Sequence, residues 1–362
     1  MITFTNKYEN EVKIFTDQID DTSLAQITEL ANCEPYAHSK IRIMPDVHAG
    51  KGCTIGTTMT IRDCITPNLV GVDIGCGMLT IELNISSVDF KTLDKIIYEL
   101  IPHGFDIHKH PSDYDFSDLR CANNPDIDLY RGQCSLGTLG GGNHFIEIDK
   151  DDNGTLYLII HSGSRNIGLS VATHYQKIAE NTNRCQENRE LSFLTNNDFS
   201  NYIHDVKIMQ QFASDNRKRM AEIILATMGW IAKNQFETIH NYIDTDKMIL
   251  RKGAIRAEKD ERVLIPINMK DGCIIARGHG NPDWNFSAPH GAGRVLSRTQ
   301  AKKQLSMNTF QNSMKGIYTT SVKKSTLDES PEAYKSISDI LSWINDSVTV
   351  EKIIKPIYNF KA

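Results

Sequence analysis

Residues 137–148 read GTLGGGNHFIEI, and residues 155–168 read TLYLIIHSGSRNIG. The alternation of apolar and polar residues in HFIEI predicts a half-buried strand, whereas the apolar run TLYLII is typical of a central strand. His144 and His161 stand at the ends of these strands, where metal ligands are commonly held. The glycines that precede His144 let the backbone approach a charged ligand closely. The two segments therefore predict a sheet with imidazole side chains at the ends of its strands.

Short strand patterns recur along the rest of the chain, at residues 41–44, 53–61, 78–83, 263–267 and 273–276. The clearest helical pattern spans residues 197–234, where apolar residues recur at spacings of three and four. Further helices are expected at residues 92–101, 171–181, 292–305 and 331–345. Because the strands come in runs and do not alternate strictly with helices, the sequence favours an α+β fold over a doubly wound parallel sheet.

No tandem repeat, low-complexity block or linker divides the chain. We therefore expect a single compact domain over residues 1–362, in which β-sheets are flanked by helices. The stretch 103–134 is polar, contains two prolines and lacks a regular pattern. It is expected to form a surface excursion.

The composition is that of an ordinary globular protein, with 362 residues, 40% hydrophobic and 23% charged. A net charge of −5 argues against binding nucleic acid through overall basicity, although it is compatible with a local basic groove. The eight cysteines include no C-x-x-C pair, which disfavours a disulfide scaffold or a zinc knuckle. A charged N-terminus and the lack of a long apolar run predict a cytoplasmic protein without membrane contact.

Several residues of the kinds that bind metals lie beside glycines. Asp73 and Cys76 are three residues apart in the motif GVDIGCG, whose glycine density predicts a tight turn that can point both side chains at one ion. His144, His161 and His240 add imidazole, and carboxylate, thiolate and imidazole together suit a transition metal. Taken singly, Cys76 could be inert packing, and His240 could be a hydrogen-bonded residue of a helical segment, ETIHNYI. Taken together, the set predicts a metal site.

His290, in the motif SAPHGAGR, is a candidate nucleophile. A neutral imidazole can attack phosphorus to give a phosphoramidate that passes the group on. Gly291 and Gly293 leave room for a nucleotide phosphate, and Arg294 can neutralise charge on the phosphoryl oxygens. A helix beginning near Ala292 would add its N-terminal dipole. The alternative is an ordinary helix-entry turn with a capping histidine, and this motif alone does not decide between the two.

Six motifs, in order along the chain, resemble the RtcB family of RNA ligases: MPDVHAGKGCTIG, GVDIGCGM, GTLGGGNHFIEI, HSGSRNIG, HGAGRVLSRT and LDESPEAYK. The similarity runs from about residue 41 to Lys361. It implies GTP- and Mn²⁺-dependent joining of an RNA 2′,3′-cyclic phosphate or 3′-phosphate end to a 5′-hydroxyl end, in RNA repair or tRNA splicing. In the implied reaction His290 takes up GMP from GTP and passes it to the RNA 3′-phosphate. The 5′-hydroxyl then attacks that phosphate and expels GMP.

The resemblance also implies a set of metal ligands. Cys76 would bridge two Mn²⁺ ions. Asp73 and His144 would complete one metal site, and His161 and His240 would complete the other. Two cations so placed can hold the attacking and leaving oxygens of an in-line displacement.

Further roles follow from the same resemblance. Asp46 would orient the nucleophile His290. The implied nucleotide and RNA contacts are Asn143 to the GTP phosphates, Glu147 and Lys361 to guanine, Tyr334 to a ring, and Arg165 to RNA phosphate or triphosphate. Asn216 and Arg217, in the motif FASDNR, resemble phosphate contacts as well, and the alternative for this pair is a solvated helix face.

The chain departs from the family at residues 266–270, where PINMK replaces a Pro-Gly-Ser-Met-Gly loop. The bulky Ile267 and the charged Lys270 should change how the backbone approaches the nucleotide. Together with the shorter chain, this loop indicates a divergent branch. We expect a monomer that acts on RNA, and a requirement for an activating protein partner stays open. Two alternatives also stay open, a two-metal RNA phosphoesterase without nucleotidyl transfer and a non-catalytic homologue that binds damaged RNA.

Overall fold

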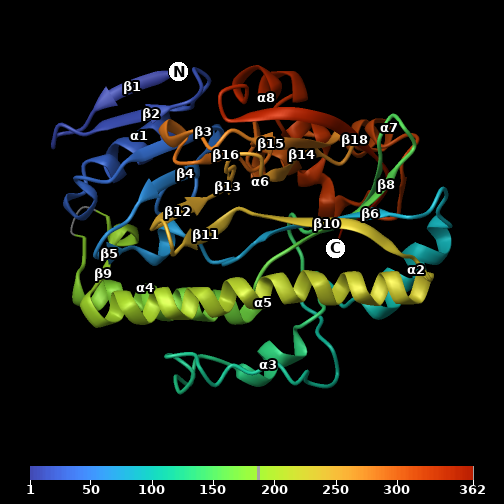
Figure 1. The fold of residues 1–362 in the computed structure, drawn as a ribbon, viewed down its shortest axis with the longest axis horizontal. Coiled ribbons are helices and arrows are strands. Elements are labelled where there is room, and N and C mark those ends of the chain that lie inside the picture. Colours follow the sequence, from blue (N-terminus) through green and yellow to red (C-terminus); the bar gives the residue numbers. More distant parts are fainter. Residues whose placement is uncertain (186–187, 362) are drawn as a thin grey trace.

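The structure is a computed structural model that describes residues 1–185 and 188–361. Two large β-sheets lie above a layer of long helices in Figure 1. The first sheet has six strands in the order β1–β2–β3–β4–β12–β11. In that order the strands span Ile2–Thr5, Glu11–Ile14, Ile41–His48, Ile55–Thr60, Ile249–Lys252 and Asn241–Asp244.

The second sheet has the order β10–β6–β8–β7–β18–β15–β14, with the short β17 (Tyr318–Thr319) paired to β18. Its strands span Ala232–Ile239, Gly77–Leu83, Leu156–Ser162, Phe145–Lys150, Val348–Lys361, Gly272–Gly278 and Arg262–Asn268. Two small antiparallel pairs complete the strands, β5 (Cys64–Ile65) with β9 (Leu194–Thr195) and β13 (Ala254–Arg256) with β16 (Ser287–Pro289).

The second sheet curls so that its two end strands meet. The Leu264 N–H of β14 donates a hydrogen bond to Thr238 Oγ1 of β10 at 3.0 Å. Residues at alternate strand positions point to opposite faces, so each strand contributes to both sides of the sheet. The inner face encloses a buried apolar cluster of Met78, Phe145, Tyr157, Ile159, Leu264, Cys273, Ile275 and Ile354. The curl therefore creates a small interior whose rim carries the site described below.

Two of the helices pack on the outer face of the curled sheet. The helices are α1 (Asp21–Ala31), α2 (Phe90–Leu100), α3 (Leu129–Cys134), α4 (Arg165–Thr182), α5 (Asn196–Met228), α6 (Arg298–Gln304), α7 (Met307–Ser313) and α8 (Ile337–Trp343). Met220 and Ile224 of α5 and Leu93 of α2 pack on outward-facing residues of the sheet. Figure 1 shows α4 and α5 along one side of the molecule, beneath both sheets.

Most expected elements are present, and the α+β class is confirmed. All seven expected strand segments fall on strands, and residues 92–101 and 171–181 fall largely on α2 and α4. Helix α5 is shorter than predicted because Gly229 adopts a left-handed conformation with φ 66°, and β10 follows. The expected helix at 331–345 is interrupted because Tyr334 is extended, which leaves the short 3₁₀ turn Pro331–Ala333 and then α8.

Two helix predictions near the candidate site are wrong. The segment 292–305 is helical only from Arg298, where Ser297 caps α6, so no helix begins near Ala292. The segment ETIHNYI is not helical either, because it runs through β10 and β11.

The stretch 103–134 consists of turns and the short helix α3, and in Figure 1 it lies on the far side of α5 from the sheets. Phe116, Leu119, Cys121 and Ile127 are nevertheless buried and belong to the largest apolar cluster. The excursion is therefore anchored to the core. In the described ranges, no helix combines the length and apolar composition needed to cross a membrane.

Candidate active site

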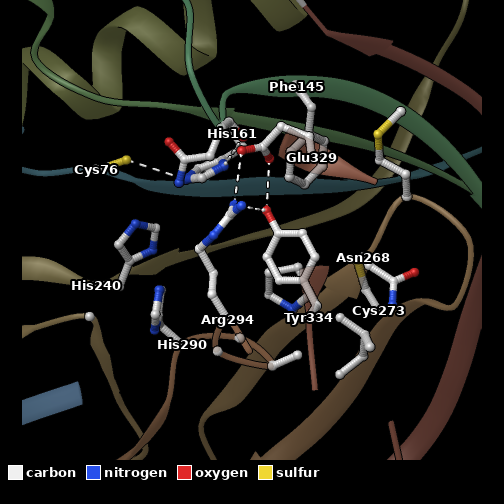
Figure 2. Close-up of a pocket in the computed structure, with 18 of the residues that line it drawn as sticks. Cys76, Phe145, His161, His240, Asn268, Cys273, His290, Arg294, Glu329 and Tyr334 are labelled. Atoms are coloured by element: carbon white, nitrogen blue, oxygen red, sulfur yellow. Dashed lines mark hydrogen bonds and ion pairs between the residues drawn. The ribbon is translucent and has the colours of Figure 1, made fainter. Parts of the chain in front are cut away.

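A cavity of about 390 Å³ opens at the rim of the curled sheet. Twelve residues singled out from the sequence line it: Asp73, Cys76, Asn143, Glu147, His161, His240, His290, Gly291, Gly293, Arg294, Tyr334 and Lys361. Asp46 and His144 lie behind this lining and contact it, and Arg165 contacts His144. Figure 2 shows Cys76, His240 and His290 on one side of the cavity and Cys273 on the other, with Arg294, Glu329 and Tyr334 between.

The turn GVDIGCG places Asp73 and Cys76 at the cavity. Gly71 and Gly75 have φ values of 94° and 71°, which side chains disfavour. A Cβ at Gly75 would also lie 2.8 Å from the Cβ of Ala213 on α5. The Cys76 N–H donates to the Asp73 carbonyl at 3.2 Å and closes the turn. The glycine density thus allows a tight turn pressed against α5, as the sequence predicts.

Two triads of donors share Cys76. The ligand atoms of Asp73, Cys76 and His144 all lie within 4.8 Å of one another, as do those of Cys76, His161 and His240. Cys76 Sγ lies 3.5 Å from His144 Nε2 and 3.3 Å from His161 Nε2. The structure therefore brings together all five residues expected to hold metals, in the grouping that the resemblance implies.

Backbone carbonyls orient two of the imidazoles. His144 Nδ1 lies 2.9 Å from the Leu139 oxygen, and His161 Nδ1 lies 3.1 Å from the Asn143 oxygen. Because a carbonyl only accepts, each Nδ1 acts as the donor in its contact and each Nε2 faces the triads. His161 Nε2 faces Cys76, whereas His144 Nε2 lies 2.9 Å from Asp73 Oδ2 as well as near Cys76. His240 Nδ1 is buried and has no hydrogen-bond partner among the described residues. This donor set fits a pair of transition-metal ions.

The protonation states of the donors differ. Burial opposes the ionisation of Asp73, but His144 and Arg165 outweigh it and lower the pKa of Asp73 to about 2. Burial lowers the pKa values of His161 and His240, which keeps both rings neutral. Burial and the neighbouring Asp73 raise the pKa of the Cys76 thiol well above its usual value. Metal binding would therefore displace a proton from Cys76 and none from these two imidazoles.

Asn216 and Arg217 are fully buried in α5, so both sequence interpretations of this pair are wrong. Arg217 Nη1 donates to the carbonyl oxygens of Gly75 at 2.8 Å and Ser162 at 2.7 Å, and Nε donates to Glu237 at 3.0 Å. Asn216 Oδ1 accepts from two backbone N–H groups, of residues 137 and 138. The pair fastens the backbone of the metal-binding turns to α5 and does not face solvent or the cavity.

Arg165 opens α4 with φ 59°, a left-handed conformation that is uncommon outside glycine. Its Nη1 lies 3.3 Å from His144 Nδ1, and its Nε donates to Thr138 Oγ1 at 3.3 Å. A Cβ at Gly140 would overlap the guanidinium, at 1.9 Å from Nη2. The glycine run therefore makes room for a cationic side chain beside the Asp73 triad.

His290 is held by a buried carboxylate. Its Nδ1 lies 2.6 Å from Asp46 Oδ2, which also accepts from the Gly291 N–H at 3.2 Å. The ring centroid lies 5.0 Å from that of His240. Because Asp46 engages Nδ1, Nε2 is the atom of His290 left to react. The loop that follows is not helical, and it passes so close to β3 that a Cβ at Gly293 would lie 2.3 Å from the Asp46 carbonyl oxygen.

Glu329 was not singled out from the sequence, although it lies in the motif LDESPEAYK. It is buried and receives hydrogen bonds from Arg294 Nη1 at 3.2 Å, from the Tyr334 hydroxyl at 2.8 Å and from Lys361 Nζ. Burial opposes its ionisation, but the cations, Lys361 first, outweigh burial and lower its pKa to about 2. The sequence signal that could have identified Glu329 is its position in the same motif as Tyr334, which is an expected nucleotide contact.

Glu147, Lys361 and the hairpin between β14 and β15 also contribute to the cavity wall. Asn268 and Met269 of this hairpin line the cavity, whereas Lys270 is exposed and does not. The departure from the family motif therefore changes the cavity wall through Ile267 and its neighbours, and not through a charge at residue 270.

Two groups of potential metal ligands beside the His290 imidazole are suited to metal-dependent chemistry on phosphate groups. The family model described as tRNA-splicing ligase RtcB matches residues 26–124 and 120–362. The chain is 31% identical to the RNA-splicing ligase RtcB of Escherichia coli K12, over 87% of this chain and 88% of that protein. It is 27% identical to the tRNA-splicing ligase RtcB of Aeropyrum pernix, over 92% and 89% of the two chains. The chain therefore belongs to the RtcB family.

Proposed function

We propose that the protein is a GTP- and Mn²⁺-dependent RNA ligase that joins an RNA 3′-phosphate or 2′,3′-cyclic phosphate end to a 5′-hydroxyl end through a guanylated His290. The family supports RNA ligation. The observation that carries the finer proposal is the placement of His290, with Nδ1 on Asp46 and its ring 5.0 Å from His240 of the second triad. In this position His290 would react next to cations held by the second triad.

In the first step His290 Nε2 attacks the α-phosphorus of GTP. A phosphorus–nitrogen bond forms, the bond to the bridging oxygen breaks, and pyrophosphate leaves. Asp46 keeps the proton on Nδ1 and stabilises the positive charge that develops on the ring. We expect Asn143 and Arg294, which both line the cavity, to contact the phosphates.

The Mn²⁺ ions would be held by Asp73, Cys76 and His144 on one side and by Cys76, His161 and His240 on the other. When bound, they supply Lewis-acid stabilisation of charge on phosphoryl oxygens. Arg165, beside the first triad, adds a fixed cation for RNA phosphate.

Glu147 and Lys361 are proposed to recognise guanine, and Tyr334 to contact the ring. Glu147 and Lys361 lie on neighbouring strands of the curled sheet, and both line the cavity. A carboxylate suits the two N–H donors on the edge of guanine. Glu329 holds Lys361 and Tyr334 in place through its hydrogen bonds.

In the later steps an RNA 3′-phosphate oxygen attacks the phosphorus on His290, and the imidazole leaves with its nitrogen lone pair restored. A cyclic phosphate end must first be opened by water to give this 3′-phosphate. The 5′-hydroxyl then attacks the activated RNA phosphorus, releases its proton and expels GMP. The product is a 3′,5′-phosphodiester.

The test is incubation with α-labelled GTP and Mn²⁺, followed by denaturation of the protein. We expect a labelled, acid-labile and alkali-stable adduct that His290→Ala abolishes. His279→Ala is the matched control, since the His279 ring bonds to Thr349 Oγ1, at 2.7 Å, and lies outside the cavity. No adduct with any divalent metal would contradict the proposal. Opening of a cyclic phosphate without GTP, unaffected by His290→Ala, would instead support a phosphoesterase.

A further inference from the structure

The inner face of the curled sheet carries a second group of potential ligands, apart from the two triads. Glu147 and Asp149 alternate along β7, and Cys273 lies on β15. One donor atom from each lies within 4.8 Å of the other two. All three side chains are buried, with exposed fractions of 3%, 0% and 1%.

These carboxyl groups lie among apolar side chains and have little to neutralise them. Phe145, Tyr157 and Ile354 belong to the same inner cluster as Cys273. Within residues 1–185 and 188–361, Glu147 Oε1 and both Asp149 oxygens lack a nitrogen or oxygen hydrogen-bond partner, and the neighbour that acts on Asp149 is the Cys273 thiol. Lys361, the nearby cation that acts on Glu147, is already paired with Glu329. Acidic groups buried in this way require either a cation or protons.

Asn359 is an independent sign of a missing ligand. It is 1% exposed, and neither its amide nitrogen nor its amide oxygen has a partner within 3.5 Å in the described part of the chain. Its amide lies near enough to Glu147 to offset part of the rise that burial gives to the pKa of that carboxyl group. It stands directly opposite Glu147 in the antiparallel ladder of β18 and β7, so both side chains leave the same face of the sheet. Its carboxamide oxygen is therefore available as a fourth donor beside the three acidic groups.

We propose that Glu147, Asp149, Cys273 and the side-chain oxygen of Asn359 bind a zinc-class divalent cation. Carboxylate oxygens with one thiolate in a four-donor set suit Zn²⁺, which binds oxygen and sulfur together and favours four ligands. The donors come from three hydrogen-bonded strands, β7, β18 and β15, so the site is built on rigid elements. Glu147, Cys273 and Asn359 also line the cavity, which gives the ion a path of entry.

This site shares no residue with the two triads. In Figure 2 Cys273 lies across the cavity from Cys76. A cation here would fix the orientation of the Glu147 carboxylate, which also lines the cavity. The site shares Glu147 with the proposed guanine contact, but its tests measure metal content alone and need neither GTP nor RNA.

The first test is zinc stoichiometry after removal of metals by a chelator, reloading with Zn²⁺ and dialysis. Cys273→Ser and Asp149→Asn should each bind about one zinc fewer per chain than the wild type, with unchanged circular dichroism. Asp151→Asn is the matched control, since Asp151 follows β7 but its carboxylate is satisfied by Lys352 at 2.8 Å. It should bind as much zinc as the wild type. Wild-type zinc content in both site variants would overturn the proposal.

The second test uses the wild-type protein, so it does not depend on a variant that folds. Anomalous scattering at the zinc edge from zinc-soaked crystals should give a peak among Glu147, Asp149 and Cys273. No peak there would overturn the proposal and indicate acidic groups that share protons. Neither test involves GTP or RNA, so a failed guanylation assay leaves both results interpretable.

Discussion

The carboxylate of Asp46 lies 2.6 Å from Nδ1 of His290, although 244 residues separate the two in sequence. Asp46 is fully buried on β3, and its other oxygen, Oδ1, has no hydrogen-bond partner among the described residues. The contact decides which nitrogen of His290 carries the proton and which one faces the cavity. A histidine without this partner would distribute its proton between both nitrogens.

Asp46→Asn should therefore slow guanylation of His290 by about 10²–10⁴-fold, with little change in GTP binding. The amide can donate to Nδ1 and so favour the tautomer with its proton on Nε2, which removes the attacking lone pair. Single-turnover adduct formation with labelled GTP measures the effect. Asp126→Asn, which alters an exposed pair with Lys177, is the control and should retain the wild-type rate.

Gly293→Ala tests whether the loop that follows His290 must lie close to β3 for guanylation. Gly293 has φ 75°, and a Cβ there would lie 2.3 Å from the Asp46 carbonyl oxygen, so the loop must shift. A displacement near 1 Å costs about 10²-fold in rate. Gly316 has φ 92°, but a Cβ at that residue would meet no atom within 4 Å, so Gly316→Ala carries only the backbone strain. Equal guanylation rates for the two variants would argue against this role of the loop.

Arg217→Met should destabilise the fold by about 3–5 kcal/mol, because it leaves the Glu237 carboxylate and two turn carbonyls without their buried donor. Urea unfolding measures the loss. Arg219→Met is the matched control on the same helix, since Arg219 is exposed and pairs with Glu222 at 3.0 Å. The free energy of unfolding of Arg219→Met should differ from that of the wild type by less than about 0.5 kcal/mol. Similar losses of stability in both variants would contradict the stabilising role of the buried hydrogen bonds of Arg217.

Metal affinity should rise with pH. Burial and Asp73 raise the pKa of the Cys76 thiol, so near neutral pH the metal-free protein holds a proton that the bound ion must displace. One proton released predicts about a tenfold gain in affinity per pH unit. Calorimetric titration with Mn²⁺ in two buffers of different ionisation enthalpy counts that proton. A pH-independent affinity would show that Cys76 is not a ligand.

Glu329 should make the free energy of unfolding depend on pH in the acid range. Its pKa is lowered from 4.5 to about 2, so its contribution of about 3 kcal/mol is complete above pH 4.5 and is lost as the pH falls toward 2. Urea unfolding between pH 5 and pH 3 should show a steeper loss for the wild type than for Glu329→Gln. Glu99→Gln, at an exposed helix position, should keep the wild-type pH dependence. Parallel curves for the wild type and Glu329→Gln would contradict the account.

Local patterns predicted much of the fold and the candidate metal donors. The strands around His144 and His161 are visible because alternation and apolar runs depend on neighbouring residues. The turn at Asp73 and Cys76 is visible because its glycines adopt conformations that other residues disfavour. Both features are encoded within a few residues of the chain.

Long-range packing explains what the sequence did not predict. Asn216 and Arg217 look like exposed polar residues of a helix, yet the turns of residues 75 and 162 fold over them, and both of their carbonyl oxygens accept hydrogen bonds from Arg217 Nη1. Glu329 becomes important only when the last strand, β18, brings Lys361 to it. The segment ETIHNYI has an ambiguous period, and its pairing with β6 and β12 decides for strand.

His290 is proposed to be the residue that carries GMP. Intact-protein mass spectrometry after incubation with GTP and Mn²⁺, followed by peptide mapping under alkaline conditions, measures this directly. The mass of the wild-type protein should increase by one GMP. The added group should lie on the peptide that contains His290 and should be absent in His290→Ala. An unchanged mass, or a GMP group on a different residue, would contradict this role of His290.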